Sequence, residues 1–384
     1  MLLKLFKREL RRLTSRRIYI VMMTIVPLAC AFFFLNLMKE GLPLKVPVGI
    51  VDMDHSSISR RIGRSLNATE LIDIKTDIES FHSAMSKVRS GEIYGFFLIP
   101  SDFQKKAVAG QTPTLSFYSN MALFVPGSLS FKGFKTIAVS TSGAIVKTTL
   151  VSAGADEDMA GSMIQPVVIK THPLNNPWTN YSIYLSQSFL PCLLALIVLL
   201  VTVFSICEEQ KWGTSVEWLR EAGGNMALAL AGKLLPQTFI FTAVGIAVQA
   251  IMFGWLGFPL NNNPLHVILA MLLLVMATQS FAVFIVEMLP NLRFALCIVS
   301  LTGILCFSIA GFSFPVEKMY GGVAVFSYLV PIRYYFLIYI DQALNGIPLY
   351  YSRFYYMALL GFLLLPMLGM RRLKRHFENP VYVP

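Results

Sequence analysis

The sequence predicts an integral membrane protein that is mainly α-helical, with six transmembrane helices and a mixed α/β domain inserted between the first and second. Of its 384 residues 55% are hydrophobic and only 14% are charged, against about 25% in a soluble globular chain. The charge is also unevenly placed. Residues 39–180 carry fourteen Lys or Arg and twelve Asp or Glu, whereas the longer stretch 181–370 carries seven of each. The first range therefore resembles a soluble domain and the second a membrane domain.

Six stretches have the length of a bilayer-crossing helix, which needs about 20 mostly apolar residues. The first precedes the soluble domain, and the other five form one transmembrane domain over 181–370. We expect the spans at 18–38, 183–206, 234–257, 265–286, 294–312 and 349–370.

The basic residues predict the orientation, because Lys and Arg favour cytoplasmic loops. Residues 1–17 have a net charge of +6, which places the N-terminus in the cytoplasm and residues 39–180 outside. The loop 207–233 is then cytoplasmic, and so is the basic tail 371–384. The basic clusters flank apolar helices, so we expect anionic lipid headgroups as their partner and no nucleic acid.

A seventh apolar stretch, 323–340, is interrupted by a proline and an arginine. If it crossed the membrane, the basic tail 371–384 would lie outside, against the positive-inside rule. We therefore expect 313–348 to be an outer re-entrant element, since irregular backbone at membrane depth is tolerated where protein covers it. The candidate functional residues of this element are Phe314, Pro315, Glu317, Pro331 and Arg333.

Residues 1–17 are expected to form an amphipathic helix on the cytoplasmic leaflet rather than a plain basic anchor. Six apolar residues can share one face: Leu2, Leu3, Leu5, Phe6, Leu10 and Leu13. Basic residues cover the rest, with Lys7, Arg8, Arg11 and Arg12 as the candidates for the membrane surface. A cleaved signal peptide is disfavoured, because the following apolar run is long and lacks a small-x-small cleavage site.

The domain at 39–180 shows alternating strand and helix patterns, which predict a small mixed sheet covered by helices. Polar residues at 54–57 and at 101–102 are expected to cap the helices that follow them. The expected strands are 46–52, 71–75, 93–99, 114–118 and 166–171, and the expected helices are 57–66, 78–90, 102–109 and 128–153.

Catalytic chemistry finds little support in the sequence. Asp52, Asp54 and His55 could bind a metal or act as acid and base, but at a strand-to-helix turn their capping role is favoured. The chain has no phosphate-binding loop, no H-E-x-x-H pair and no G-x-S-x-G elbow. The five cysteines lie in apolar segments without zinc spacing. We expect neither an enzyme nor a cofactor or metal bound by this chain.

An ordered set of short motifs resembles the permease subunit of a bacterial type-2 ATP-binding cassette (ABC) exporter, in the branch with a large extracytoplasmic domain after the first helix. Each motif is weak alone, but together they span nearly the whole chain in the family's order. They are Val48–Arg61, Gly91–Phe103, Asn175–Trp178, Glu208–Glu209 with Gly213–Thr214 and Gly232–Pro236, Ala310–Met319, and Tyr328–Tyr334. Lys211, Trp212 and the run 217–225 depart from the family pattern.

This resemblance implies a permease that moves a small or amphipathic substrate outward by alternating access, in a bacterial inner membrane. ATP and Mg would be bound by separate ABC ATPase subunits, and a second permease subunit would complete a homodimer or heterodimer. A periplasmic adaptor and an outer-membrane channel are further possible partners. The loop 207–233 would transmit the ATPase movement, through Glu208, Glu209, Lys211, Trp212, Gly213 and Thr214. The alternative is a membrane-anchored receptor or scaffold whose outer domain binds a partner without transport.

Overall fold

The structure is a computed structural model that describes residues 1–384 apart from 77, 165–171, 173, 177–178 and 381–384. The chain divides into two compact units, which are described separately. The helical unit contains Met1–Gly41 and Pro173–Pro384, and the α/β unit contains Leu42–His172.

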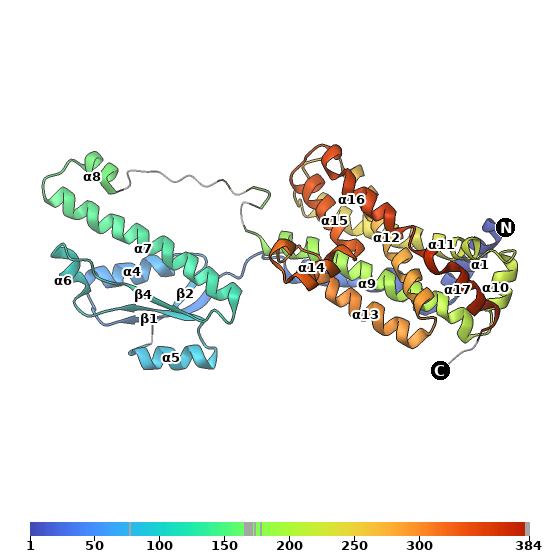
Figure 1. Cartoon of the computed structure of the whole chain (residues 1–384). Helices are drawn as coiled ribbons and strands as arrows, with labels where there is room; N and C mark the ends of the chain where they lie inside the picture. Colours follow the sequence, from blue (N-terminus) through green and yellow to red (C-terminus); the bar gives the residue numbers. More distant parts are fainter. Residues whose placement is uncertain (77, 165–171, 173, 177–178, 381–384) are drawn as a thin grey trace. The chain divides into compact units, whose positions relative to one another are not determined.

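The helical unit has six helices long and apolar enough to cross a membrane, counted over the described residues. This confirms the prediction of a mainly helical integral membrane protein. Figure 1 shows these helices lying side by side. They are Arg17–Leu37 (α2, η1 and α3), Tyr181–Lys211 (α9), Met226–Trp255 (α11 and η2), Pro264–Met288 (α12), Leu292–Ile309 (α13) and Leu349–Glu378 (α16 and α17).

The most buried of these helices is α9, which packs against α12, α13, α3 and α11. Its N-cap Asn180 accepts a hydrogen bond from the Ser182 amide, and Pro191 lies within the helix. Two bounds differ from the expectation: α9 continues to Lys211, and α11 already begins at Met226. The predicted loop 207–233 is therefore mostly helix. Glu209 pairs with Lys233, and Glu208 pairs with Arg12 and Arg16 of the N-terminal segment, so helix can continue through these charges.

The predicted re-entrant region is helical and sharply bent. The 3₁₀ turn η3 (Val316–Lys318) precedes α14 (Gly321–Tyr328), which meets α15 and η4 (Pro331–Leu344) at 81°. Pro331 occupies the first turn of α15, where its missing N–H breaks no helical bond. The bend fits either a broken span or a re-entrant element, so the expected element at 313–348 stays a prediction.

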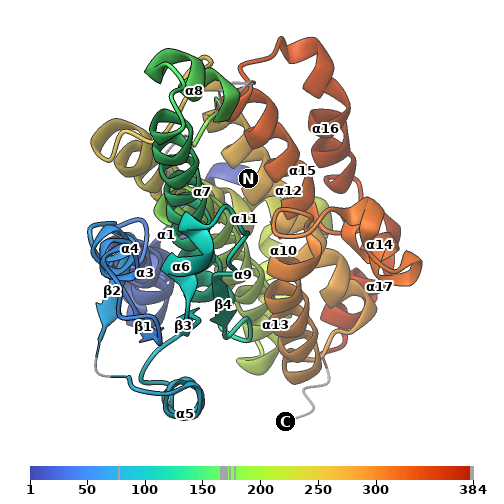
Figure 2. The same cartoon turned by 90° about the vertical axis from the view of Figure 1, so that its left-hand side faces the viewer.

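The α/β unit contains a four-stranded sheet in the order β2-β1-β3-β4, with β4 antiparallel to the other three. Figures 1 and 2 show α5 on one face and α4 and α7 on the other. The strands are β1 (Val46–Asp52), β2 (Ile72–Lys75), β3 (Gly95–Ile99) and β4 (Ser116–Ser119), and the helices are α4 (Ser57–Asn67), α5 (Phe81–Ser90), α6 (Phe103–Val108), α7 (Phe124–Ser152) and α8 (Glu157–Ile164).

Local polar contacts explain how these elements begin. The side chain of Ser56 accepts a hydrogen bond from the Ser59 amide and caps α4, as the sequence predicts. The expected cap of α6 is wrong, because Asp102 adopts a left-handed backbone (φ 62°) and its side chain makes no capping bond. The predicted strand 114–118 is shorter and ends one residue later, at Ser119. The predicted strand 166–171 lies outside the described residues.

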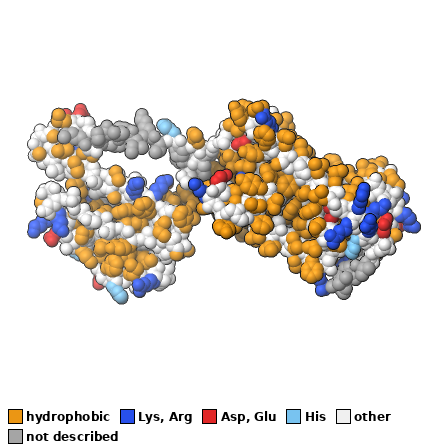
Figure 3. All heavy atoms as spheres, viewed as in Figure 1, with side chains coloured by type: hydrophobic (Ala, Val, Ile, Leu, Met, Phe, Trp, Pro, Cys, Tyr) orange, Lys and Arg blue, Asp and Glu red, His pale blue; other side chains and the backbone are white. Residues whose placement is uncertain are grey.

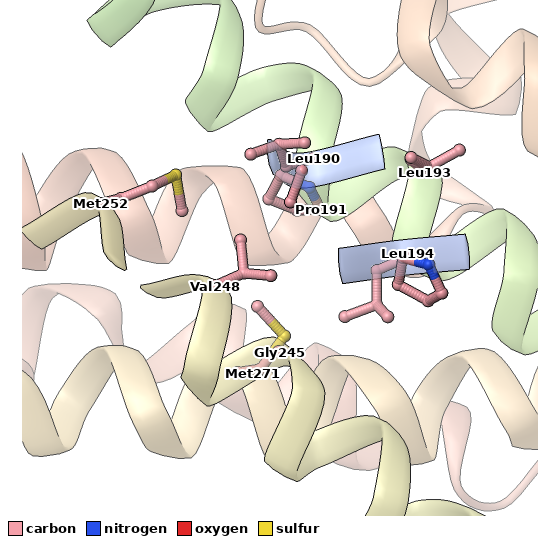
Figure 4. Close-up of a pocket in the computed structure, with 10 residues that line it drawn as sticks. Leu190, Pro191, Leu193, Leu194, Gly245, Val248, Met252 and Met271 are labelled. Carbon is pink, nitrogen blue, oxygen red and sulfur yellow. The ribbon is translucent and has the colours of Figure 1, made fainter. Parts of the chain in front are cut away.

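Close packing between α9, α11 and α12 is visible around a small apolar cavity (Figure 4). The cavity measures about 20 Å³, which is room for about one water molecule and no substrate. A Cβ atom on Gly245 would lie 2.7 Å from Met271 Sδ and 3.1 Å from Leu194 Cδ2. The glycine therefore lets these helices approach one another.

We predict that Gly245→Leu destabilises the helical unit by about 1–3 kcal/mol, because the added side chain overpacks this contact. Thermal unfolding of the purified chain in detergent measures the effect. Gly361→Leu is the matched control, since nothing lies within 4 Å of a Cβ at that helical position. An equal loss of stability in the two variants would contradict the role given to Gly245.

Candidate functional site

Charged side chains and one tyrosine meet at one end of the helical unit. They come from α1 (Leu2–Ser15), from Arg16 and the adjoining α2 (Arg17–Ile20), from the C-terminal turns of α9 and from the N-terminal half of α11. We call this set the junction cluster, and its members are Arg8, Glu9, Arg12, Arg16, Tyr19, Glu208, Glu209 and Lys233. The sequence places these residues up to 225 positions apart, and the fold brings them together.

Glu208 is almost completely buried and is surrounded by donors. Its Oε2 atom accepts from Arg12 Nη2 at 2.8 Å and from the Tyr19 hydroxyl at 2.6 Å. Its Oε1 atom accepts from Trp212 Nε1 at 3.0 Å and pairs with the Arg16 guanidinium. The carboxylate is thereby held against the start of the first apolar helix.

Glu209 has no exposed surface and joins α1, α9 and α11. Its Oε1 atom accepts from Lys233 Nζ of α11 at 2.7 Å and from Arg12 of α1. Its Oε2 atom pairs with Arg8 Nη2 at 3.4 Å and accepts from the Thr214 hydroxyl. One carboxylate therefore fixes α1 and α11 to the end of α9.

Glu9 completes the cluster, and its role is not among those expected from the sequence. Its Oε2 atom accepts from Lys233 Nζ at 3.0 Å, and its Oε1 atom accepts from Gln237 Nε2 at 3.2 Å. Gln237 also donates to Ser205 Oγ of α9 at 3.0 Å. The sequence does contain a signal for this buried ion pair. Glu9 is the only acid in a basic helix, and it lies four residues from both Leu5 and Leu13, on the same helical face.

The charges around the cluster are nearly balanced. Arg8 also reaches Glu221 of α10 (Ser215–Glu221) at 3.4 Å, and the largely exposed Lys4 lies 3.9 Å from the same carboxylate, so four carboxylates face five cations. The Lys233 ammonium also lies over the Trp218 ring, 5.0 Å from its centroid. A buried ion of this kind is tolerated because its partners and hydrogen bonds compensate for lost water.

Residues 2–15 form the expected amphipathic helix, whose place at the membrane surface stays a prediction, and two sets of its side chains lie differently from the expectation. Leu5 and Leu13, expected on the lipid side, are buried together with Glu9 along a stripe that faces α11. Arg8 and Arg12, expected at the membrane surface, instead pair with Glu209. The side chains that remain exposed are the apolar Leu2, Leu3 and Leu10 and the basic Lys4, Lys7 and Arg11.

The turn after α9 exposes a different set of residues. Lys211, Trp212 and Gly213 lie on the surface, with Trp212 60% exposed, while Glu208 and Glu209 are enclosed behind them. Gly213 has φ 68°, a left-handed conformation that a side chain would strain. Of the residues expected to touch a partner, only these three and the half-buried Thr214 present surface to one.

The candidate residues of the region 313–348 divide into an exposed and a buried group. Phe314, Pro315 and Glu317 are exposed, whereas Pro331 and Arg333 are buried. Arg333 Nη1 donates to Ser327 Oγ at 3.3 Å and to the Ala310 carbonyl at 3.4 Å, and its guanidinium lies 4.7 Å from the Tyr328 ring centroid. Arg333 thus holds the bend, and α14 lies at the end of the helical unit opposite α10 (Figure 1).

The space-filling view supports a membrane location for the helical unit. Hydrophobic side chains cover its middle, and Lys and Arg side chains gather at the end that carries α10 and α17 (Figure 3). Within the described residues, no group of three or more His, Cys, Asp and Glu is placed to hold a metal ion. Asp52, the metal candidate of the α/β unit, accepts from the Asp54 and His55 amides and from Ser59 Oγ.

We predict that Glu209→Gln destabilises the chain by about 3–5 kcal/mol, because it leaves buried cations without their carboxylate. The expected fall in the thermal midpoint is at least about 5 °C for the purified protein in detergent. Glu217→Gln is the control: Glu217 lies on α10, is exposed and forms no ion pair among the described residues. An unchanged midpoint for Glu209→Gln would show that the cluster does not hold the helices.

Comparison with known proteins assigns the chain to a family. Residues 17–369 match the family model described as ABC-2 family transporter protein. The comparisons with curated proteins and with solved structures gave no significant match. The match covers nearly the entire chain, including all six candidate spans except the end of the last. The chain therefore belongs to the ABC-2 transporter family, as a multi-pass membrane permease subunit of an ABC transporter.

Proposed function

We propose that the chain exports a small or amphipathic substrate by alternating access, driven by ATP hydrolysis in separate ABC ATPase subunits. Family membership supports the need for an ATPase partner. The observation that carries the proposal is the junction cluster, which ties α1, α9 and α11 together directly behind an exposed turn. A partner that moves this turn moves three helices at once.

The exposed turn is the proposed contact with the ATPase. Lys211, Trp212 and Gly213 offer a charge, a flat aromatic ring and an unhindered backbone in one short segment. Thr214 donates both to the Glu209 carboxylate and to its backbone carbonyl, so the turn and the cluster are connected. Glu208 and Glu209 act in this scheme as internal ties and do not touch the partner.

The length of α9 suits transmission across the membrane. Its 31 residues make a helix of about 46 Å, longer than the roughly 30 Å hydrocarbon core. Displacing its cytoplasmic end displaces the opposite end too, because α9 packs along α12 and α13 for much of its length. We propose a second permease subunit as the partner across the substrate path, and 313–348 as the outer gate.

The direction of transport rests on orientation. We propose that both termini are cytoplasmic and that the α/β unit is extracytoplasmic, because seven basic residues lie within 1–17 and four within 371–375. The α/β unit is then available to a periplasmic adaptor and, through it, to an outer-membrane channel in a bacterial inner membrane.

Cysteine labelling tests this orientation. The native cysteines are first replaced, and a single cysteine is introduced as Ser86→Cys or Glu217→Cys. In cells whose outer membrane has been permeabilised, a membrane-impermeant maleimide is expected to label Ser86→Cys. Glu217→Cys is expected to react only after the cells are lysed. Both positions are exposed, on α5 and α10 respectively. The reverse pattern would place the α/β unit in the cytoplasm and overturn the proposed direction.

ATPase coupling tests the function itself. We expect the co-purified ATPase to be stimulated by the wild-type chain in lipid nanodiscs, and Trp212→Ala to reduce this stimulation at least fivefold. Trp212→Phe keeps an aromatic ring but removes the hydrogen bond to Glu208. This variant therefore distinguishes a contact of the aromatic ring with the ATPase from support of the junction cluster. Trp255→Ala is the control, because Trp255 is 79% exposed at the other end of α11 and η2.

Two results would contradict the proposal. A wild-type chain that neither binds the ATPase nor stimulates it would favour a membrane-anchored receptor or scaffold. Equal losses in Trp212→Ala and Trp255→Ala would show that the turn is not the contact.

A further inference from the structure

A hollow of about 780 Å³ lies beside α4 in the α/β unit. Small-molecule sites in proteins commonly measure 300–1,000 Å³. We call this hollow the α4 groove, and all of its walls belong to the α/β unit. Its lining consists of Ile50, Asp52, His55, Ser59, Arg60, Gly63, Arg64, Asn67, Ile74, Thr76, Ile78 and Glu79.

The groove exists because β2 is shorter than β1. Strand β1 pairs with β2 only over Val46–Gly49, and it pairs with β3 over Gly49–Asp52. Beyond Lys75 the chain leaves the sheet edge, and Ile78 packs with Val51 and Phe96 on the α5 face. The position that a longer β2 would occupy beside Ile50–Asp52 is therefore open, and residues of α4 line it.

The floor and the wall of the groove differ in chemistry. Ile74 is half-buried and provides most of the apolar surface, whereas Ile50 and Ile78 are 8% and 4% exposed and contribute only their edges. Gly63 leaves space in the groove, because a Cβ at this position would lie in contact with Ile50 Cδ1, at 3.4 Å. An apolar group of a ligand would remove this surface from water, at about 25 cal/mol for each Å² buried.

The wall carries two cations that form no ion pair with the described residues. Arg60 and Arg64 are four residues apart, so they lie on the same face of α4, and neither forms an ion pair with any described residue. Asn67 continues this face. Its Oδ1 atom accepts from the Ile74 amide at 3.0 Å, which leaves the Nδ2 group as a donor.

Neither described acid of the groove forms an ion pair with these arginines. Asp52 is turned toward its own loop, where it accepts from the Asp54 and His55 amides at 3.0 Å and from Ser59 Oγ at 2.6 Å. Glu79 follows β2, lines the groove from outside α4 and makes no ion pair among the described residues. Among the residues that the structure describes, no carboxylate therefore occupies either guanidinium group.

We propose that the α4 groove binds a small ligand with an apolar body and a phosphate or carboxylate group. The anionic group is held by Arg60 and Arg64, whose planar guanidinium groups match oxyanions through paired hydrogen bonds. The apolar body lies on Ile74 and on the exposed edges of Ile50 and Ile78. This assignment depends on neither the transport function nor the orientation of the chain.

Binding to the full-length protein in zwitterionic lipid nanodiscs tests the site, with empty nanodiscs as blank. The first probe is phenyl phosphate, and phenyltrimethylammonium is the probe with the same ring and the opposite charge. We expect saturable binding of phenyl phosphate in isothermal titration calorimetry and none of phenyltrimethylammonium. The double variant Arg60→Gln/Arg64→Gln is expected to weaken phenyl phosphate binding at least tenfold.

The chain offers a matched control on the same helix. Arg61 is exposed on α4 but lines a different hollow, next to α7, so Arg61→Gln is expected to bind phenyl phosphate as the wild type does. Gly63→Leu fills the groove while keeping both arginines, and it is expected to weaken binding at least fivefold. Circular dichroism checks that each variant is folded.

Arginine modification locates the bound probe independently. Phenyl phosphate is expected to protect Arg60 and Arg64, but not Arg61, from phenylglyoxal, as read by peptide mass spectrometry. Soluble dihexanoyl phosphatidic acid then identifies the source of the anion: tighter binding than phenyl phosphate indicates a lipid headgroup, and weaker binding indicates a free phosphate ester. Absence of saturable binding by the wild type, or equal losses in Arg61→Gln and the double variant, would overturn the site.

Discussion

The buried carboxylate of Glu209 is the constraint on which the end of the helical unit that carries α1 and α10 depends. It contacts Arg8 and Arg12 from α1, Lys233 from α11 and Thr214 from the exposed turn. Removing water from one carboxylate costs several kcal/mol, so the ion is stable here only while its partners stay in place. The positions of α1, α9 and α11 are therefore interdependent, and a change at the turn cannot be absorbed by one helix alone.

The hydrophobic pattern was sufficient to predict the membrane helices, because a span must be long and apolar whatever its neighbours are. It was not sufficient at Glu208, Glu209 and Lys233. A charge read from sequence alone indicates solvent, since an isolated ion is costly to bury. Only the fold brings α1 onto these residues, so the true helix ends at Lys211 and Met226 were missed.

The α/β unit shows the same division between local and distant information. The Ser56 cap and most strand positions were predictable, because they depend on a few neighbouring residues. The left-handed backbone of Asp102 and the short overlap of β1 with β2 were not, since both depend on how distant segments pair. The α4 groove follows from that short overlap, and thus it was also hidden from the sequence.

The junction cluster raises the question of why a membrane protein would use ions where apolar side chains pack as tightly. Replacing a buried ion pair by apolar residues often costs no stability. Apolar contacts, however, tolerate sliding and lipid substitution, and α1 already exposes Leu3 and Leu10 beside its basic face. Paired charges with fixed hydrogen bonds admit one register of α1 on α11, because a shift by one residue leaves ions unpaired. When the turn moves, α1 and α11 then move with it and do not slide past one another.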